Sequence, residues 1–301
     1  MKQTGKAKRN TVLTALAAVS ALVLAVWQSL LLQSKFDFDT HTYDPGTASP
    51  MLMLAVLAVF VLFFLSTLVW KKEKTEETLS RGGVLLSVSA SLCGAALLVS
   101  CGLFFHTMLF SGLPYAGNPD RAQYALKLAS ALLAIPSAVY FFRIAFSRQK
   151  LSRPAVMLSF APVAYTAVFL VGVYYDRSIR LNSPVRILDQ LALIALMLAL
   201  LYESRFQMER PNARLYKAFA WSALPLLGVS AIPHAVMMAG GSYAMDASGA
   251  GYAFAAFCAL YLAVRLFSLS DSEQEEVSIE QTEADAVETE ADAGEKDNEQ
   301  N

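Results

Sequence analysis

The amino-acid sequence predicts an all-α, polytopic membrane protein whose chain crosses a bilayer eight times. Eight mainly apolar stretches are separated by charged clusters, and each is close to or above the ~20 residues that one helical crossing needs. Of the 301 residues, 16% are charged and 55% are hydrophobic. A soluble domain has roughly 25% charged residues. These observations together favour a membrane domain over a large soluble one.

Helices fit the apolar stretches better than barrel strands. Barrel strands alternate apolar and polar residues over ~10-residue segments, and soluble helices show a polar face at a 3.6-residue period. Neither pattern occurs in 55–65 or 191–201, which are apolar throughout. The predicted crossings are Thr11–Leu32, Pro50–Trp70, Val84–Phe110, Tyr124–Ser147, Ala155–Tyr175, Ile187–Phe206, Leu215–Gly240 and Ala250–Leu269.

The first crossing also has features of a signal peptide, because four basic residues between Lys2 and Arg9 precede its apolar run. A signal peptide usually has an apolar region of only ~7–15 residues that ends in small residues at a cleavage site. The run Thr11–Leu32 is longer and has no small-x-small site at its end. We therefore expect an uncleaved anchor helix.

The distribution of Lys and Arg predicts the orientation of the chain. With eight crossings both termini lie on one side, and 18 of the 24 basic residues fall on that side. Basic flanks favour the cytoplasm. We therefore predict a protein of the cell membrane with both termini in the cytoplasm.

The chain divides into a membrane domain, residues 1–269, and an acidic tail, residues 270–301. The tail has 13 Asp or Glu residues, a single basic residue, Lys296, and no aromatic residue. Such a segment cannot bury enough apolar surface to offset the entropy of ordering it, so we predict disorder. It either solubilises the protein or contacts a basic cytoplasmic partner or the protein's own basic loops.

The third and seventh crossings share a pattern that predicts a four-plus-four duplication of residues 1–147 and 148–269. Two of the three histidines, His106 and His234, are each followed at identical spacing by Gly, Tyr and Ala. The alternative is a chance match. In a duplication the two halves would be related by an axis along the membrane normal.

A polar layer near the predicted outer surface is the candidate ligand-binding site. Ionisable groups at membrane depth are costly and usually face a bundle interior or a water-filled cavity. The alternatives are that the long side chains reach the headgroups and that each histidine only bonds a neighbouring carbonyl. The residues of this layer are His106, Lys127, Arg186, Asp189, Gln190 and His234.

Four smaller features add to this picture. Arg177 and Arg180 in an outer loop suit lipid headgroups or an anionic substrate, because arginine binds phosphate and carboxylate bidentately. Glu203, with Arg205 beside it and Arg143 and Arg265 at a matching depth, predicts an ion-pair layer near the inner surface. Pro225 and Pro233 should kink the seventh crossing, and broken helices often line transporter sites. The three cysteines have no metal-binding spacing, so we expect packing roles and no disulfide.

Three function classes remain open. The first is a transporter or small-solute binding protein with an outward-facing site. The second is a non-catalytic scaffold or regulatory subunit whose tail contacts a cytoplasmic partner. The third is a membrane anchor of a redox complex in which His106 and His234 bind haem. No nucleophile–base pair or metal cluster is evident, so we expect no enzyme, no metal, no cofactor and no nucleic-acid partner, and the bilayer is the main environment.

Overall fold

The computed structural model describes residues 2–37, 42–44, 46–68, 83–111, 121–146, 156–176, 183–208, 210, 212–241 and 248–269. Within these ranges, eight helices are long and apolar enough to cross a membrane. The predicted fold class is therefore confirmed. The acidic tail and the loop with Arg177 and Arg180 lie outside the described residues.

The helices match the predicted crossings with shifted ends. They are α1 (Lys2–Lys35), α2 (Ser49–Leu68), α3 (Val84–Ser111), α4 (Arg121–Phe146), α6 (Ala161–Tyr175) after the 3₁₀ turn η1 (Leu158–Phe160), α7 (Pro184–Gln207), α8 (Ala213–Ala239) and a last helix, Ser248–Leu269. The largest difference is at α1, which begins at Lys2 instead of Thr11.

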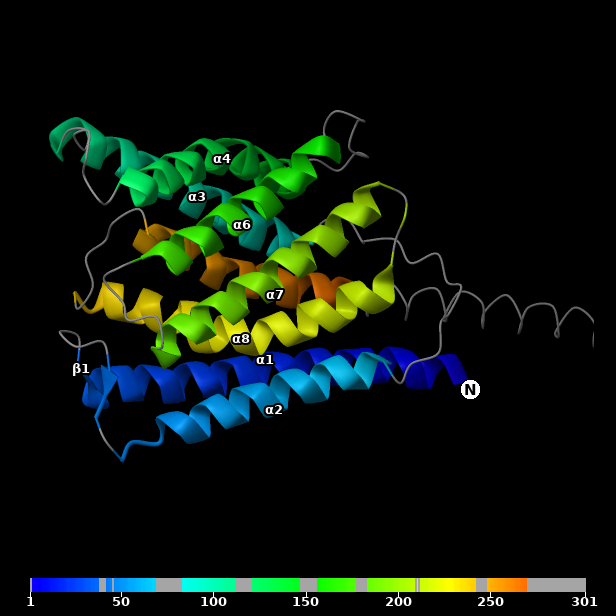
Figure 1. The fold of residues 1–301 in the computed structure, drawn as a ribbon. Helices are drawn as coiled ribbons and strands as arrows, with labels where there is room; N and C mark the ends of the chain where they lie inside the picture. The colour runs from blue at the N-terminus through cyan, green and yellow to red at the C-terminus, as the bar shows by residue number, and fades with distance from the viewer. Residues whose placement is uncertain are drawn as a thin grey trace, which may run out of the picture.

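A short antiparallel hairpin follows α1. Its strands are β1 (Phe36–Asp37) and β2 (Thr42–Tyr43), with Phe36 opposite Tyr43. The hairpin lies at the end of the bundle opposite the start of α1 (Figure 1). We call this the hairpin end. The other end, where α1 begins and the last helix finishes, is the terminal end. Which end faces the cytoplasm stays a prediction from the basic residues.

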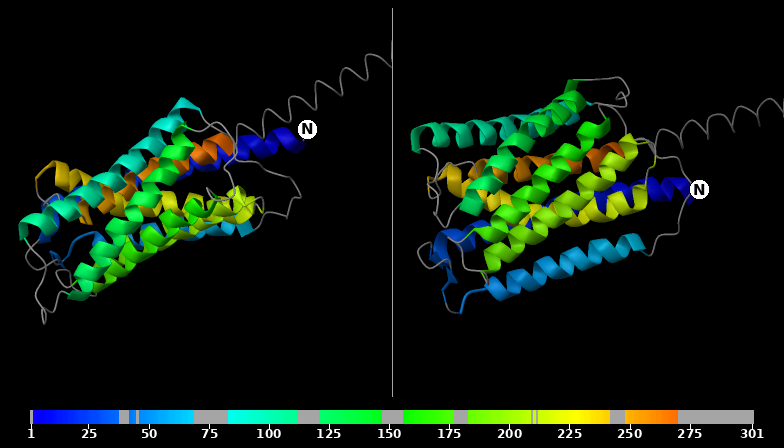
Figure 2. Two further views of the ribbon diagram at one scale, coloured as in Figure 1. Left: turned by 90° about the horizontal axis from the view of Figure 1, so that it is seen from above. Right: turned by 45° about the horizontal axis from the view of Figure 1, so that its top comes forward.

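The helices form a bundle with α8 and the last helix at its centre. α8 packs along α1, α2 and α7, and α6 continues the row from α7 to α4 and α3. Figure 2 shows α2 at one edge of the bundle and α3 with α4 at the opposite edge. The last helix contacts α3, α4 and α6 through Cys258 and Phe254.

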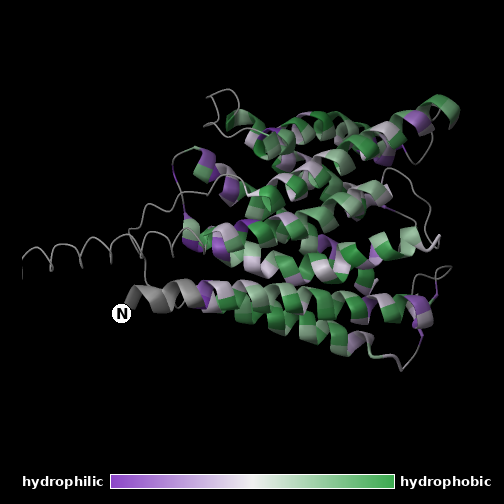
Figure 3. Ribbon diagram, turned by 180° about the vertical axis from the view of Figure 1, so that it is seen from behind, coloured by the Kyte–Doolittle hydropathy of each residue, from purple (hydrophilic) through white to green (hydrophobic). Residues whose placement is uncertain are grey.

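Burial differs strongly between central and peripheral helices. The most apolar window of α8 is 72% buried inside the protein, whereas that of α2 is 22% buried. The large side chains of Met51, Leu54 and Leu62 on α2 are exposed. Apolar residues cover the lengths of the helices and hydrophilic residues gather toward their ends (Figure 3). This is the pattern of a bundle whose outer surface faces lipid.

α1 and α8 approach closely because Gly228 has no side chain. A Cβ atom at this position would lie 2.4 Å from the backbone oxygen of Ala21 on α1. Small residues allow such close backbone contact in membranes, where packing and interhelical hydrogen bonds hold helices together. One such bond lies nearby, since the Trp221 indole donates to the Thr14 hydroxyl at 3.0 Å.

Local sequence sets the ends of α7 and α8. The Asn212 side chain accepts a hydrogen bond from the Leu215 amide at 3.2 Å, which caps the start of α8. Gly241, with φ of 75°, follows its end in the left-handed conformation that glycine adopts without strain. Pro184 opens α7, where its missing N–H costs nothing. These local signals fix where α7 starts and where α8 starts and ends. They therefore also fix the depth of the polar residues near those helix ends.

The predicted duplication stays a prediction, which the helix neighbours do not test. The third and seventh crossings are α3 and α8. Among the labelled helices, α8 packs extensively along three others, whereas α3 packs extensively along α4 alone. The shared spacing around His106 and His234 therefore stays an observation about the sequence.

Candidate functional site

Asp189 on α7 is the centre of a buried polar cluster near the hairpin end. Its side chain has no solvent exposure. The Ser230 hydroxyl on α8 donates to Oδ1 at 2.6 Å, and the Tyr252 hydroxyl on the last helix donates to Oδ2 at 2.9 Å. Two neutral donors from two other helices therefore hold the carboxylate.

His234 completes this group, which we call the Asp189 cluster: Asp189, Ser230, His234 and Tyr252. Its Nδ1 lies 2.8 Å from the backbone oxygen of Ser230, one turn earlier in α8. A carbonyl oxygen only accepts, so Nδ1 carries a proton and donates. Nε2 faces Oδ2 of Asp189 at 3.8 Å. The imidazole ring stacks on the Tyr252 ring, with centroids 4.0 Å apart.

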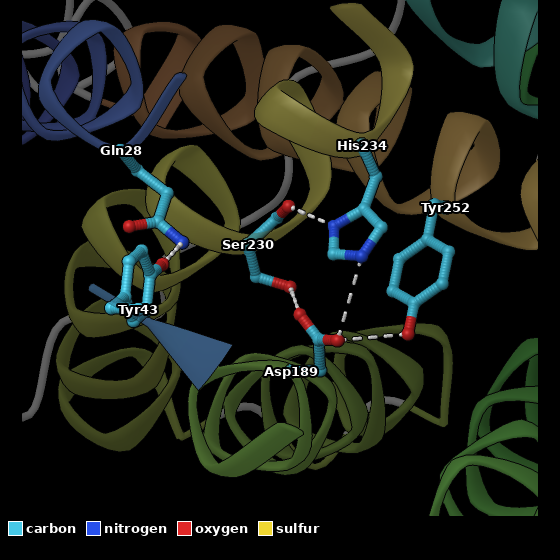
Figure 4. Close-up of polar contacts among 6 residues, drawn as sticks. All are labelled: Gln28, Tyr43, Asp189, Ser230, His234 and Tyr252. Carbon is cyan, nitrogen blue, oxygen red and sulfur yellow. Dashed lines mark hydrogen bonds and ion pairs between the residues drawn. The ribbon is translucent and has the colours of Figure 1, made fainter. Parts of the chain in front are cut away.

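The four side chains converge from three helices at similar depth. At 1.5 Å per residue, Asp189, His234 and Tyr252 each lie roughly 6–8 Å inside the hairpin end of their helix. In Figure 4, Ser230, His234 and Tyr252 all point toward the Asp189 carboxylate. The arrangement brings one carboxylate, one imidazole and two hydroxyls together across three helices.

The hairpin and α1 lie beside the Asp189 cluster (Figure 4). Gln28 on α1 donates to the Tyr43 hydroxyl at 2.7 Å, and both residues lie beside the cluster (Figure 4). A small apolar group packs with Tyr43 and joins the hairpin to the ends of α7 and α8. Its members are Leu32, Phe36, Val185 and Met237. The Asp189 carboxylate itself is closed off from solvent.

The predicted polar layer is only partly brought together. Asp189 and His234 meet, as described above. Arg186, one turn before Asp189, is buried and donates to the backbone oxygen of Tyr174. Gln190 is half-buried on α7, and Lys127 is half-buried near the start of α4.

His106 lies apart from the Asp189 cluster. It is exposed on α3, where its ring contacts Phe110 in the same helix. The neighbouring Leu109 is 81% exposed, so this end of α3 projects its apolar side chains outward. The physical reason is that α3 packs against α4 at the edge of the bundle, away from the α7–α8 contact.

Ser230 and Tyr252 are the residues that sequence reasoning missed. Ser230 lies four residues before His234, so the two share a face of α8, and this spacing was a usable signal. The sequence gave no such signal for Tyr252, because tyrosine is common near the ends of membrane helices whether or not it faces a site.

A second buried cluster lies near the terminal end, where the sequence predicted an ion-pair layer. Glu203 has no solvent exposure, and the Arg265 Nε lies 3.3 Å from its Oε1. The Tyr261 hydroxyl also donates to Oε1. Arg143 is exposed, and Arg205 lies over the Tyr202 ring. The predicted layer is thus one buried Glu203–Arg265 pair.

The fold and the two clusters define the protein as a polytopic α-helical membrane protein with buried ionisable groups. Among the described residues, no group of three or more His, Cys, Asp or Glu side chains could hold a metal ion. Comparisons with protein-family models, curated proteins and solved structures find no match to this chain. Its function must therefore be argued from the clusters themselves.

Proposed function

We propose that the protein is a transporter of small solutes, driven by protons that bind at the Asp189 cluster. The observation that carries this proposal is the buried pair of Asp189 and His234, joined across α7 and α8. Ionisable side chains inside a membrane domain are costly, and they mark ion pathways and proton relays. A cluster with only a packing role could use uncharged residues instead.

The hydrogen bonds of His234 support binding of one proton by the pair. Because Nδ1 already donates to the Ser230 carbonyl, a neutral imidazole turns the lone pair of Nε2 toward the Asp189 carboxylate. Two acceptors then face each other. One added proton, on Nε2 or on Oδ2, converts this repulsion into an attraction. Uptake of a proton therefore changes the force between α7 and α8.

The same carboxylate defines the chemistry of the solute. Ionised Asp189 is an acceptor-only group, so it suits a solute with an ammonium or other donor group. Such a group would compete with the proton for the same oxygens. We infer exchange of a small donor-bearing solute against protons, with the hairpin end predicted to face outward.

The two other function classes have weaker support. Haem ligation by the two histidines is difficult to reconcile with the geometry, because His106 is exposed on α3 and the His234 ring is covered by Tyr252. The scaffold proposal depends on the acidic tail, which lies outside the described residues.

Currents from proteoliposomes test the proposal. The full chain is reconstituted, a pH gradient is imposed, and a panel of amino acids, polyamines and primary amines is added on a solid-supported membrane. We expect a current with one chemical class that reverses when the gradient is reversed. Asp189→Asn should abolish the response to the gradient. The matched control is Asp44→Asn, the same substitution at an exposed residue beyond the hairpin.

Two results would overturn the proposal. One is the absence of a gradient-dependent current with every compound, although the reconstituted protein is folded. The other is a current that Asp189→Asn leaves unchanged. A loss of current in Asp44→Asn as well would show that the effect is not specific to the cluster.

A further inference from the structure

Glu203 is a second buried carboxylate, and its two oxygens have different surroundings. Oε1 accepts from the Tyr261 hydroxyl and lies beside the Arg265 guanidinium. The Arg265 Nε also donates to the Tyr261 oxygen at 3.0 Å. Tyr261 and Arg265 are one turn apart on the last helix. Among the described residues, the hydrogen bond from Tyr261 and the ion pair with Arg265 both reach the carboxylate at Oε1.

The other oxygen, Oε2, has no hydrogen-bond partner among the described residues, and neither has the hydroxyl of Tyr216 on α8. Both side chains have no solvent exposure. Leaving a buried acceptor unpaired costs about 1–3 kcal/mol, and more for a charged group. The Tyr216 ring packs on Phe206, one turn after Glu203 on α7, with centroids 5.4 Å apart, so both unpaired oxygens belong to the same part of the bundle.

Other ionisable groups surround Glu203. Tyr140 on α4 and Tyr216 on α8 lie within electrostatic range of it, as does Cys258 on the last helix. With Tyr261 and Arg265, these are the groups that face the carboxylate from the packed helices. Arg265 is the one permanent charge among them.

Glu203 and Asp189 lie on one face of α7. They are fourteen residues apart, which is about 21 Å along the helix and within roughly 40° around it. The buried residues between them on this face are all apolar: Ala192, Leu193, Leu196, Ala199 and Leu200. On α7 itself these apolar side chains, which we call the apolar layer, separate the two carboxylates.

We propose that Glu203 is a second proton-binding site, which exchanges protons with the terminal end through a water molecule shared by Oε2 and the Tyr216 hydroxyl. The direction in which Glu203 passes protons rests on the proposed function, but the protonation of Glu203 does not. With the Asp189 cluster it forms a pair of half-sites on α7, one on each side of the apolar layer.

The protonation step changes charge without changing any carbon bond. A proton arrives from water, forms an O–H bond on Oε2 and leaves hydroxide or neutral water behind, depending on its donor. Oε1 keeps its bond from Tyr261. The Glu203–Arg265 pair changes from zero net charge to plus one. Arg265 then lacks a counter-charge, which favours movement of the last helix relative to α7.

Infrared difference spectra of the full chain in lipid nanodiscs test the proposal between mildly acidic and mildly alkaline pH. We expect a carbonyl band of a protonated carboxylic acid that appears on acidification and shifts in heavy water. Glu203→Gln should remove the component of this band that comes from Glu203, whereas a component from Asp189 should remain. Asp189→Asn is the matched control, because it removes the other buried carboxylate of α7 and should leave the Glu203 band in place.

A second variant covers the case in which Glu203→Gln does not fold. Tyr216→Phe keeps Glu203 but removes the hydroxyl that shares the water, so the band should move to higher frequency. A difference band in Glu203→Gln that is identical to that of the unaltered protein, or one that is unaltered in Tyr216→Phe, would overturn the proposal. If the Glu203 band fails these tests while Asp189→Asn still abolishes transport, the proposed function remains and the inner site is wrong.

Discussion

The two buried carboxylates of α7 are held in different ways. Both oxygens of Asp189 accept from neutral hydroxyls, and a histidine stands beside one of them. Glu203 instead has an arginine and a tyrosine at one oxygen, while the other has no partner among the described residues. The two residues share a helix, a face and a similar distance from the nearer helix end.

The difference in partners teaches how each site can change its charge. Around Asp189, the partners are neutral or titratable, so the cluster can gain a proton without leaving a permanent cation behind. Around Glu203, protonation leaves the Arg265 charge uncompensated in a buried setting, which is costly. Charge changes should therefore be local at Asp189 and should be coupled to helix movement at Glu203.

Removal of the Arg265 charge should have the largest effect on stability. Arg265→Met leaves Glu203 buried without its counter-ion, and breaking such a pair costs about 3–5 kcal/mol. The free energy of unfolding in mixed micelles measures this loss. Combining the change with Glu203→Gln should restore much of it. The control Arg205→Met, at a half-exposed arginine of the same helix end, should cost about 1 kcal/mol or less. Equal losses at Arg265 and Arg205 would contradict the buried ion pair.

The apolar layer between the carboxylates should tolerate truncation poorly. Leu196→Ala removes a fully buried side chain and leaves a cavity, which costs about 2–5 kcal/mol. Leu191→Ala, at a leucine of α7 that is 42% exposed, is the matched control and should cost much less. Thermal unfolding in detergent compares the two. Similar losses would mean that the layer is not packed as described.

A single hydroxyl at the Asp189 cluster should contribute a moderate amount. Tyr252→Phe keeps the ring against His234 but removes the donor to Oδ2, and a hydrogen bond to a charged group contributes about 1.5–3 kcal/mol. Thermal unfolding in detergent again measures the loss of stability. Tyr175→Phe, at an exposed tyrosine near the hairpin end, is the control. No loss in Tyr252→Phe would argue against an ionised Asp189 held by this hydroxyl.

The same substitution at the other cluster should have the smallest effect. The Tyr216 hydroxyl has no protein partner among the described residues, so Tyr216→Phe should change stability by less than about 1 kcal/mol in either direction. Comparison with Tyr252→Phe then measures the difference between the clusters directly. A large loss in Tyr216→Phe would show that this hydroxyl has a strong partner after all.

The sequence predicted the helices well and the contacts between them poorly. A crossing requires a long apolar run whatever it packs against, so helix positions follow from composition alone. The helices on which α3 and α8 pack do not follow from composition, because apolar faces pack almost equally well on lipid and on one another. The matched spacing around His106 and His234 therefore suggested equivalent positions, although His106 is exposed and His234 is buried.

The candidate site was accessible to sequence reasoning only through its charged members. Asp189 and Glu203 stand out because ionisable residues are rare inside membrane helices. Ser230 and Tyr252 do not stand out, since hydroxyl residues satisfy their own helix in many positions, as Ser137 and Thr166 do here. Which hydroxyls face a carboxylate depends on helix rotation, which an apolar sequence does not specify.

The close contact between Gly228 and Ala21 has a consequence for biosynthesis. Synthesis proceeds from the N-terminus, so α1 enters the membrane long before its partner α8 exists. Until then α1 carries an apolar surface with small residues that matches no helix yet made, and lipid or a helper protein must cover it. The centre of the bundle can close only when the seventh crossing arrives. A ribosome pause or truncation before residue 213 would therefore leave an inserted but unassembled chain, which quality-control proteases can recognise.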